Sequence, residues 1–540
     1  MRKLGLVLAA CLSTAAAAAP PPAPPKLIVA ISGDQFSADL FDEYRAQFTG
    51  GLARLSRGAL FRNGYQGHNA TETCPGHSTI LTGSRPSRTG IIANSWFDLG
   101  IARSDKRIYC AEDERAPGSS SSDYVVSPLH LKVPTLGELM KARNPATRVV
   151  AVAGKDRAAV MMTGRGADQR WYWDGKTYST DLKDARVPAS VTAARTAVAA
   201  LIAAPGEPLE SPPLCASKSR NFALAEGTSV GSGRFARAAG DVRNFRYTPA
   251  FDGMTLALGA KLIDEMKLGQ GAASDLIAIG LSATDYVGHG FGSGGEEMCL
   301  QLLSLDRDLG DFLGLLDRRG IDYAVVLTAD HGGEDIPERL RARGVAQADR
   351  VDPALVPATL GKAVAAKLGL SGPVLIGEGA SGEVYLDRAL KPADRKRALG
   401  AVLAAYRANP QVEAIFTKEQ IARHPSPKGP PDRWSFLDRA RASFDPERSG
   451  DLLVMLKKHV TPIPNPGPGY VATHGSPWDY DRRVPIMFWR RGMTPVTIEG
   501  AVETADILPT LGAMIALPVN ADSIDGHCLA GVEGATCPSR

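Results

Sequence analysis

Hydrophobic runs along the chain predict several strands that are buried on both faces. Largely apolar runs of five or six residues occur at 27–31, 149–153, 276–281, 323–328 and 485–489. Runs without the alternation of a half-exposed strand are typical of parallel sheets that helices cover on both sides. Helix-like segments lie between them, at 133–143, 255–267 and 302–318. This alternation predicts an α/β fold with a large central, mostly parallel β-sheet flanked by helices.

Two stretches interrupt the alternating pattern. Residues about 160–250 and 340–470 carry fewer buried-strand signals and contain many proline, glycine and arginine residues. We interpret both stretches as cap subdomains inserted into one catalytic domain that covers residues 27–540. A single large α/β domain with insertions is compatible with a chain of 540 residues.

The first residues have the pattern of a secretory signal peptide. Arg2 and Lys3 precede a short apolar run that ends at Ala19, in a small-residue cleavage site at 17–19. We expect residues 1–19 to be a signal peptide, 20–26 to be a proline-rich spacer, and the mature protein to be periplasmic or secreted. The alternative is a lipid anchor on Cys11, within Leu-Ala-Ala-Cys, but its signal would have only ten residues.

Composition and charge exclude several classes of protein. The content of 44% hydrophobic and 22% charged residues is that of an ordinary globular protein. The formal net charge is +4, and loss of Arg2 and Lys3 lowers it to +2, so nothing favours binding to nucleic acid beyond its use as a substrate. No later run predicts a transmembrane segment. The oligomeric state stays open, and a monomer is compatible with the sequence.

The cysteine count predicts disulfides. An even number in an exported protein favours disulfide bonds. Cys528 and Cys537 are close enough in sequence to form one pair, and the other pairings stay open. The six cysteines that remain after the signal are Cys74, Cys110, Cys215, Cys299, Cys528 and Cys537.

The stretch Thr-Glu-Thr-Cys-Pro-Gly-His-Ser at 71–78 is the first candidate for chemistry. It combines a hydroxyl, a proline–glycine break and a histidine, ahead of a helix that we expect to begin near Thr79. At such a junction Thr73 can present its Oγ1 beside free backbone N–H groups, which favour an anion. Because a threonine hydroxyl is a poor nucleophile at neutral pH, a base or a metal must activate it. The alternative is that Thr73 only caps the helix.

Carboxylates and imidazoles follow the predicted strands, where ligands of open α/β sheets bind. Each alone could be an ordinary loop residue, but together they offer nitrogen and oxygen donors without cysteine, which suits catalytic zinc. Two metals roughly 4 Å apart can clamp the attacking and leaving oxygens of a phosphoryl transfer. We expect one metal on Asp285, His289 and His474 and the other on Asp34, Asp330, His331 and Thr73.

An ordered series of motifs resembles the alkaline phosphatase superfamily. It is most similar to exported bacterial alkaline phosphatases with a threonine nucleophile, relatives of the nucleotide pyrophosphatase/phosphodiesterases, and it covers residues 34 to about 517. The resemblance implies that Thr73 becomes phosphorylated, that the seven groups named above bind two zinc ions, and that Asn94 contacts a phosphate oxygen. The motifs are Gly33-Asp34, Thr73-Cys-Pro-Gly-His77, Asn94, Lys155-Asp-Arg157, Asp285-x-x-x-His289, Asp330-His331-Gly332 and His474-Gly-Ser.

Lys155 and Arg157 distinguish the subfamilies. A phosphate monoester dianion carries one more negative charge than a diester, and two cations spaced i, i+2 at a strand end can reach one pocket. In the threonine-type alkaline phosphatases such a pair contacts the substrate phosphate. The alternative is that Lys155 and Arg157 are ordinary surface charges.

The resemblance therefore implies a zinc-dependent phosphate monoester hydrolase of broad substrate range, with diesterase activity as a side reaction. Its partners would be small-molecule phosphate esters. The serine-type alkaline phosphatases add a magnesium site, for which we find no ligand set, and we expect His77 to be structural. The first alternative is a phosphodiesterase or nucleotide pyrophosphatase using the same two metals. The second, from another class, is a catalytically silent, metal-stabilised binding protein.

Overall fold

The computed structural model describes residues 23–224 and 227–538. The predicted signal peptide and Cys11 lie outside the described residues. Within the described parts of the chain, no helix combines the length and the apolar character that crossing a membrane requires.

The fold is built on a ten-stranded sheet in the order β19–β2–β18–β11–β1–β10–β5–β6–β7, with β20 paired to β2. Its centre is parallel, because β1 lies between β10 and β11 and the parallel pairing continues through β5 to β6. β18 runs antiparallel to both β11 and β2. The predicted α/β fold with a mostly parallel sheet is therefore confirmed. The strands are β1 (Leu27–Gly33), β2 (Ala59–Tyr65), β5 (Val149–Ala153), β6 (Gln169–Trp173), β7 (Tyr178–Ser179), β10 (Asp275–Leu281), β11 (Tyr323–Thr328), β18 (Arg483–Arg490), β19 (Val496–Ile498) and β20 (Val502–Glu503).

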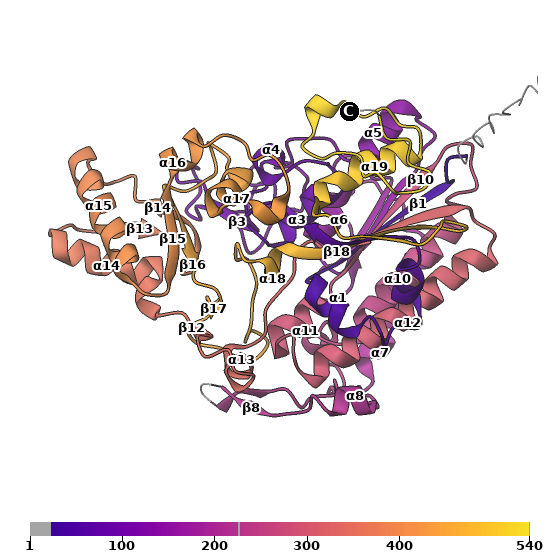
Figure 1. The fold of residues 1–540 in the computed structure, drawn as a ribbon, viewed down its shortest axis with the longest axis horizontal. Coiled ribbons are helices and arrows are strands. Elements are labelled where there is room, and N and C mark those ends of the chain that lie inside the picture. The colour runs from indigo at the N-terminus through magenta and orange to yellow at the C-terminus, as the bar shows by residue number, and fades with distance from the viewer. Residues whose placement is uncertain (1–22, 225–226, 539–540) are drawn as a thin grey trace, which may run out of the picture.

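Helices cover both faces of this sheet, which explains the uninterrupted apolar runs. In β1, Val29 and Ile31 pack into one hydrophobic core, whereas Ile28 and Ala30 pack into the other. In Figure 1, α10 and α12 lie below the sheet, and α5 and α19 lie above it. The helices around the sheet are α1 (Ala38–Tyr44), α2 (Gly51–Leu55), α3 (Thr73–Ile80), α4 (Pro86–Thr89), α5 (Leu136–Arg143), α6 (Asp156–Thr163), α7 (Ala189–Ala203), α8 (Pro213–Ala216), α9 (Val242–Phe245), α10 (Pro249–Glu265), α11 (Ala283–Phe291), α12 (Glu296–Arg318), α13 (Pro337–Ala342), α18 (Asp479–Arg482) and α19 (Ile507–Met514).

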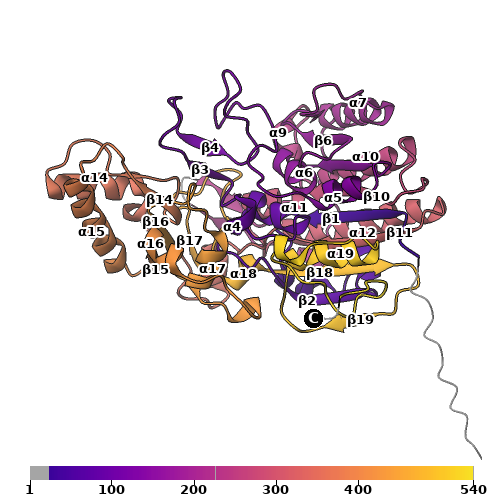
Figure 2. The same ribbon diagram turned by 90° about the horizontal axis from the view of Figure 1, so that it is seen from above.

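A separate lobe stands beside the main sheet (Figures 1 and 2). Its sheet has the order β13–β14–β16–β15, and α14 and α15 pack with it around a hydrophobic core of its own. The boundaries that we assigned to the two inserted subdomains remain predictions. The elements of the lobe are β13 (Leu375–Ile376), β14 (Gly382–Leu386), β15 (Val412–Thr417), β16 (Leu452–Leu456), α14 (Pro357–Leu368), α15 (Pro392–Ala408), α16 (Lys418–Arg423) and α17 (Phe436–Ser443).

Short strand pairs complete the described fold. β3 and β4 form an antiparallel hairpin near α3, and β8 pairs with β9. β12 and β17 form a parallel pair where the chain enters and leaves the lobe. Their bounds are β3 (Ser95–Phe97), β4 (Arg107–Tyr109), β8 (Phe222–Ala223), β9 (Ser229–Val230), β12 (Asp349–Arg350) and β17 (Val460–Thr461).

The helix after the nucleophile candidate begins earlier than its sequence predicts. We expected a break at Pro75-Gly76 and a start near Thr79, but α3 begins at Thr73. Pro75 is the third residue of the helix. Backbone N–H groups in this first turn make no intrahelical hydrogen bond, so the missing N–H of proline costs none. Gly76 lets α3 approach the end of β11, because a Cβ there would lie 2.0 Å from the carbonyl oxygen of Asp330. Packing against the sheet thus overrides the local break signal and brings α3 close to Asp330.

Three disulfides link the six cysteines that follow Cys11. The predicted Cys528–Cys537 pair is confirmed. The other two bonds, whose partners the sequence left open, are Cys74–Cys110 and Cys215–Cys299.

Candidate metal centre and active site

Four neighbouring parallel strands deliver five of the predicted site residues to one edge of the sheet. Asp34 follows β1, Asp285 lies in α11 after β10, and Asp330 and His331 follow β11. Lys155, which follows β5, is the N-cap of α6. All five side chains are at most 3% exposed. The expected convergence at the carboxyl ends of the strands is therefore present.

The three histidines of this cluster present their Nε2 atoms to carboxylates. The Nδ1 atoms of His289, His331 and His474 donate to the backbone carbonyls of Ala472, Gly332 and Thr71, at 2.7–2.8 Å. A neutral imidazole with its proton on Nδ1 has a lone pair on Nε2. The Nε2 atoms of His289 and His474 each lie 3.4 Å from Asp285 Oδ1. His331 Nε2 lies 3.4 Å from Asp34 Oδ1 and equally far from Asp330 Oδ2.

This arrangement fits a metal centre. Acceptor atoms face one another at these distances, and a bound cation would satisfy them while the carbonyls fix the histidine tautomers. Among the described residues, the buried Asp34 Oδ1 and His331 Nε2 have no hydrogen-bond partner. Nitrogen and oxygen donors alone are compatible with zinc. Two groups have ligand atoms within 4.8 Å of one another, namely Asp34–Asp330–His331 and Asp285–His331–His474.

The two groups depart from the predicted division of ligands at two histidines. His331 belongs to both compact groups, whereas His289 belongs to neither and contacts the centre through Asp285. Thr73 is 1% exposed, and its hydroxyl faces the cations of the site. The assignment of individual ligands to individual metals remains a prediction.

Burial and charge set the protonation of the cluster. Burial raises the pKa of Asp34 well above its ordinary value, and the neighbouring Asp285 and Asp330 raise it further. Burial also lowers the pKa of His331 to about 3 and that of His289 to about 4, so both imidazoles are neutral at pH 7. Neutral imidazoles are the form that binds a metal.

Two cations converge on the Thr73 hydroxyl. Lys155 Nζ lies 3.5 Å and Arg157 Nη2 lies 3.4 Å from Thr73 Oγ1. Lys155 Nζ also lies 2.7 Å from Asp34 and 2.5 Å from Asp285. Burial would lower the pKa of Lys155, but these two carboxylates outweigh it and raise that pKa above its ordinary value. The lysine is therefore charged at neutral pH.

Asn94 lies beside the start of α3. Its Oδ1 accepts a hydrogen bond from the backbone N–H of Cys74 at 2.8 Å. Its own backbone N–H donates to Glu72 at 2.6 Å. His77 is buried within α3, with Nδ1 2.9 Å from the carbonyl oxygen of Thr73 and 3.0 Å from Asp330 Oδ2.

Sequence reasoning missed four side chains that surround these groups. Glu72 holds the backbone of Asn94. Tyr109 and Tyr124 both donate to Asp156, and Tyr109 also contacts Arg157. Asp156 could have been found from its place between Lys155 and Arg157, but no local signal marks the two tyrosines.

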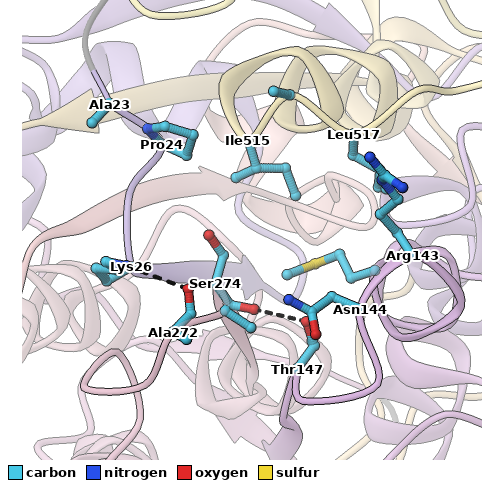
Figure 3. A pocket seen from close by; sticks show the side chains of 13 residues that line it. Ala23, Pro24, Lys26, Arg143, Asn144, Thr147, Ala272, Ser274, Ile515 and Leu517 are labelled. Atoms are coloured by element: carbon cyan, nitrogen blue, oxygen red, sulfur yellow. Dashed lines mark hydrogen bonds between the residues drawn. The ribbon is translucent and has the colours of Figure 1, made fainter.

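Another pocket lies at the opposite edge of the sheet and is unrelated to this centre. It has a volume of about 330 Å³ and is lined by residues that precede β1, β5 and β10, among them Lys26, Thr147 and Ser274. In Figure 3, Lys26 donates to the carbonyl of Ala272, and Thr147 donates to that of Ser274. No predicted catalytic, substrate-binding or metal-binding residue lines this pocket.

Comparisons with known proteins show what the chain is similar to. A model of the family described as type I phosphodiesterase / nucleotide pyrophosphatase matches residues 28–477. Alkaline phosphatase PhoK of a Sphingomonas species is 58% identical over 94% of this chain and 91% of its own length. Alkaline phosphatase PhoD of Zymomonas mobilis is 44% identical over 95% of this chain and 90% of its own. The crystal structure of alkaline phosphatase PafA superposes with a TM-score of 0.81 at 25% identity, covering 96% of this chain and all of that one.

Proposed function

Because the chain belongs to the type I phosphodiesterase / nucleotide pyrophosphatase family, within the alkaline phosphatase superfamily, we propose that it is an alkaline phosphatase. It would hydrolyse small-molecule phosphate monoesters through a covalent intermediate on Thr73. The observation that carries this proposal is the convergence of Lys155 and Arg157 on Thr73 Oγ1, each within 3.5 Å. Two cations beside one nucleophile match the charge of a monoester dianion.

The proposed cofactor is a pair of zinc ions. One ion would be held by Asp285, His289 and His474, and the other by the group listed next. Bound there, the ions would lower the pKa of the threonine hydroxyl and neutralise charge on the phosphate. The second set of ligands is Asp34, Asp330, His331 and Thr73.

The remaining steps follow from the side chains of this chain. Arg157 and Lys155 donate hydrogen bonds to phosphate oxygens. To do so, Lys155 gives up one of its contacts with a carboxylate. Asn94 has its Oδ1 engaged by Cys74 N–H, which leaves its amide hydrogens to donate to another phosphate oxygen. Thr73 gives up its hydroxyl proton and its oxygen attacks phosphorus in line. The bond from phosphorus to the ester oxygen breaks, and that oxygen takes up a proton as the alcohol leaves.

Water then hydrolyses the phosphothreonine and releases inorganic phosphate. Each of the two in-line displacements inverts the configuration at phosphorus, so the complete reaction proceeds with retention. Transfer of the phosphoryl group from an aryl phosphate that is chiral at phosphorus to an acceptor alcohol would report this outcome.

A second candidate function is favoured by the family description itself, which names phosphodiesterases and nucleotide pyrophosphatases. The same centre could act on a diester, with Lys155 and Arg157 facing a phosphate that carries one charge fewer. Diesterase activity is expected as a side reaction of a monoesterase.

The experiment that separates these functions compares rates on an aryl phosphate monoester and on the matching diester, with zinc counted on the same preparation. The proposal expects a monoester preference of several orders of magnitude and two zinc ions per chain. A diester preference would assign the chain to the phosphodiesterase function. The variant Thr73→Ala should abolish turnover, whereas Thr196→Ala, at an exposed threonine of α7, should not. Activity that survives in pure Thr73→Ala protein would overturn the role of Thr73.

A further inference from the structure

Asp156 lies between the two substrate-facing cations in sequence, but its carboxylate is engaged by two tyrosines. Asp156 is the first residue of α6 and is 8% exposed. Its Oδ1 accepts a hydrogen bond from Tyr109 Oη at 2.8 Å, and its Oδ2 accepts one from Tyr124 Oη at 2.9 Å. Two phenol donors on one carboxylate form a satisfied, buried network of fixed geometry.

The network continues to Arg157. Arg157 Nη1 donates to Tyr109 Oη at 3.3 Å, while its Nη2 lies 3.4 Å from Thr73 Oγ1. Because the Tyr109 hydroxyl donates its only proton to Asp156, its lone pair is directed to the guanidinium. One end of the Arg157 fork is thus held by protein, and the other end faces the nucleophile.

The tyrosines come from a segment that is anchored to the nucleophile helix. Tyr109 ends β4, and Tyr124 follows in the next loop with its ring centroid 4.5 Å from that of Tyr109. The Cys74–Cys110 disulfide joins the residue after Tyr109 to the residue after Thr73. Tyr109, Trp96 and Val160 also belong to one hydrophobic cluster.

A free arginine side chain loses rotamer entropy when it is fixed. A guanidinium that the fold already holds in place has lost that freedom before the substrate arrives, which favours binding and the transition state. The benefit is largest for a substrate that uses Arg157 fully, which is a terminal phosphate with three free oxygens.

We propose that Tyr109, Asp156 and Tyr124 are positioning residues that hold Arg157 against Thr73 and thereby set the selectivity for phosphate monoesters over diesters. This inference rests on the proposed function and deepens it. Tyr109 and Tyr124 donate to Asp156, and Tyr109 alone of the three accepts from Arg157. Their effect passes through Arg157 alone.

The test compares single tyrosine-to-phenylalanine variants. Tyr109→Phe removes the hydroxyl that joins Asp156 to Arg157, and we expect kcat/KM for an aryl monoester to fall at least tenfold and that for the diester to fall less than threefold. Tyr124→Phe removes one hydrogen bond to Asp156 without touching Arg157, and we expect a two- to fivefold loss on the monoester. The matched control is Tyr406→Phe, whose buried hydroxyl donates to Leu355 O in the lobe, and it should change neither rate.

A double variant distinguishes positioning from a general structural effect. If Tyr109 acts through Arg157, then Tyr109→Phe should cost nothing further in an Arg157→Ala background. Equal losses on monoester and diester, or a full additional loss in that background, would overturn the inference.

The inhibition constant of inorganic phosphate provides a readout that does not depend on substrate preference. We expect Tyr109→Phe to weaken phosphate binding about tenfold, and an unchanged constant would contradict the inference. A wild-type preference for the diester would overturn the proposed function, and phosphate binding would still decide whether Tyr109 positions Arg157.

Discussion

Asn94 Oδ1 accepts a hydrogen bond from the backbone N–H of Cys74, the residue directly after Thr73. This bond fixes which end of the Asn94 amide is engaged by the protein. Since the oxygen is engaged by protein, the amide nitrogen is available as a donor.

Replacing Asn94 should therefore reduce phosphate recognition in a graded way. Asn94→Ala removes one donor to a charged oxygen, and we expect kcat/KM for a monoester to fall roughly 10- to 100-fold. Asn94→Asp can still accept from Cys74 N–H but places a negative charge at the phosphate, so its loss should be larger. Steady-state kinetics on an aryl phosphate measures kcat/KM for both variants. The control is Asn409→Ala, because the Asn409 amide donates to Asp352 in the lobe. An aspartate variant as active as wild type would contradict this orientation.

Removing either cation should reduce monoester turnover more than diester turnover. We expect Lys155→Ala and Arg157→Ala each to lower kcat/KM for the monoester by roughly 10²- to 10³-fold, because a buried charge-assisted contact to the phosphate is lost. The diester should lose about tenfold or less. Parallel assays on the matched ester pair measure the ratio. Equal losses on both esters would argue against the monoesterase assignment.

Chelation should abolish activity reversibly. Dialysis against a chelator would remove the ions that the ligand groups hold, and added zinc should restore turnover with two ions per chain. The thermal midpoint should fall on chelation, since a ligand that binds only the folded state stabilises it. His289→Ala should lower zinc content, whereas His459→Ala, at a histidine paired with Glu334 elsewhere, should leave it unchanged. Full activity in metal-free protein would refute the metal centre.

The two disulfides Cys74–Cys110 and Cys528–Cys537 should differ in their effect on activity. The first closes a loop of 36 residues beside the nucleophile, and its replacement by serine pairs should lower the free energy of unfolding by about 3–4 kcal/mol. It should also lower monoester activity, because it joins the start of α3 to the Tyr109 segment. The second disulfide joins cysteines that are nine positions apart in the sequence, and it lies away from the centre. Its removal should leave kcat/KM unchanged, and a similar loss in both variants would contradict this distinction. Urea unfolding and kinetics on each variant provide the measurements.

Asp252 should make stability depend on pH. Burial raises its pKa to about 7, although it accepts hydrogen bonds from Ala283 N–H and Gln301 Nε2. A folded-state pKa above the unfolded value means that the contribution of Asp252 to stability is fully present below about pH 4. That contribution is lost as the pH rises to about 7. Asp252→Asn is neutral throughout, so its advantage over wild type should grow over this interval and then stay constant.

The expected difference is on the order of 2–4 kcal/mol, since a pKa difference of one corresponds to about 1.4 kcal/mol. Urea midpoints of both proteins at pH 5 and pH 8 measure it. Asp311→Asn, at an exposed position of α12, is the control and should show no such trend. If the stability advantage of Asp252→Asn over wild type shrinks as the pH rises, the predicted direction of the pH dependence is wrong.

Much of the fold could be predicted because its central strands are buried on both faces. The apolar runs that end before Asp34, Asp285 and Asp330 correspond to β1, β10 and β11, and so the carboxylates were found together. β2 was missed because its second half, with Arg62 and Asn63 half-buried, lacks a continuous apolar run.

The parts that could not be predicted depend on contacts between distant segments. The start of α3 at Thr73 follows from packing of Gly76 on Asp330, which no local pattern encodes. Asn94 was found only through resemblance, because its role depends on contacts with Cys74 and Glu72. Tyr109 and Tyr124 carry no signal of their own, since a tyrosine hydroxyl gains its role only from the partner that the fold supplies.

The candidate ligands of the centre are distant in the chain: Asp34, Asp285 and Asp330 follow neighbouring strands of the sheet, and His474 lies in the loop before α18. Asp34 is near one end of the sequence and His474 near the other, and β1 lies between strands that begin at residues 275 and 323. A chain that is still being synthesised therefore has no complete centre until residue 474 has left the ribosome. Metal loading is then coupled to folding of the whole sheet, and a truncated or prematurely released chain cannot become a partially active hydrolase.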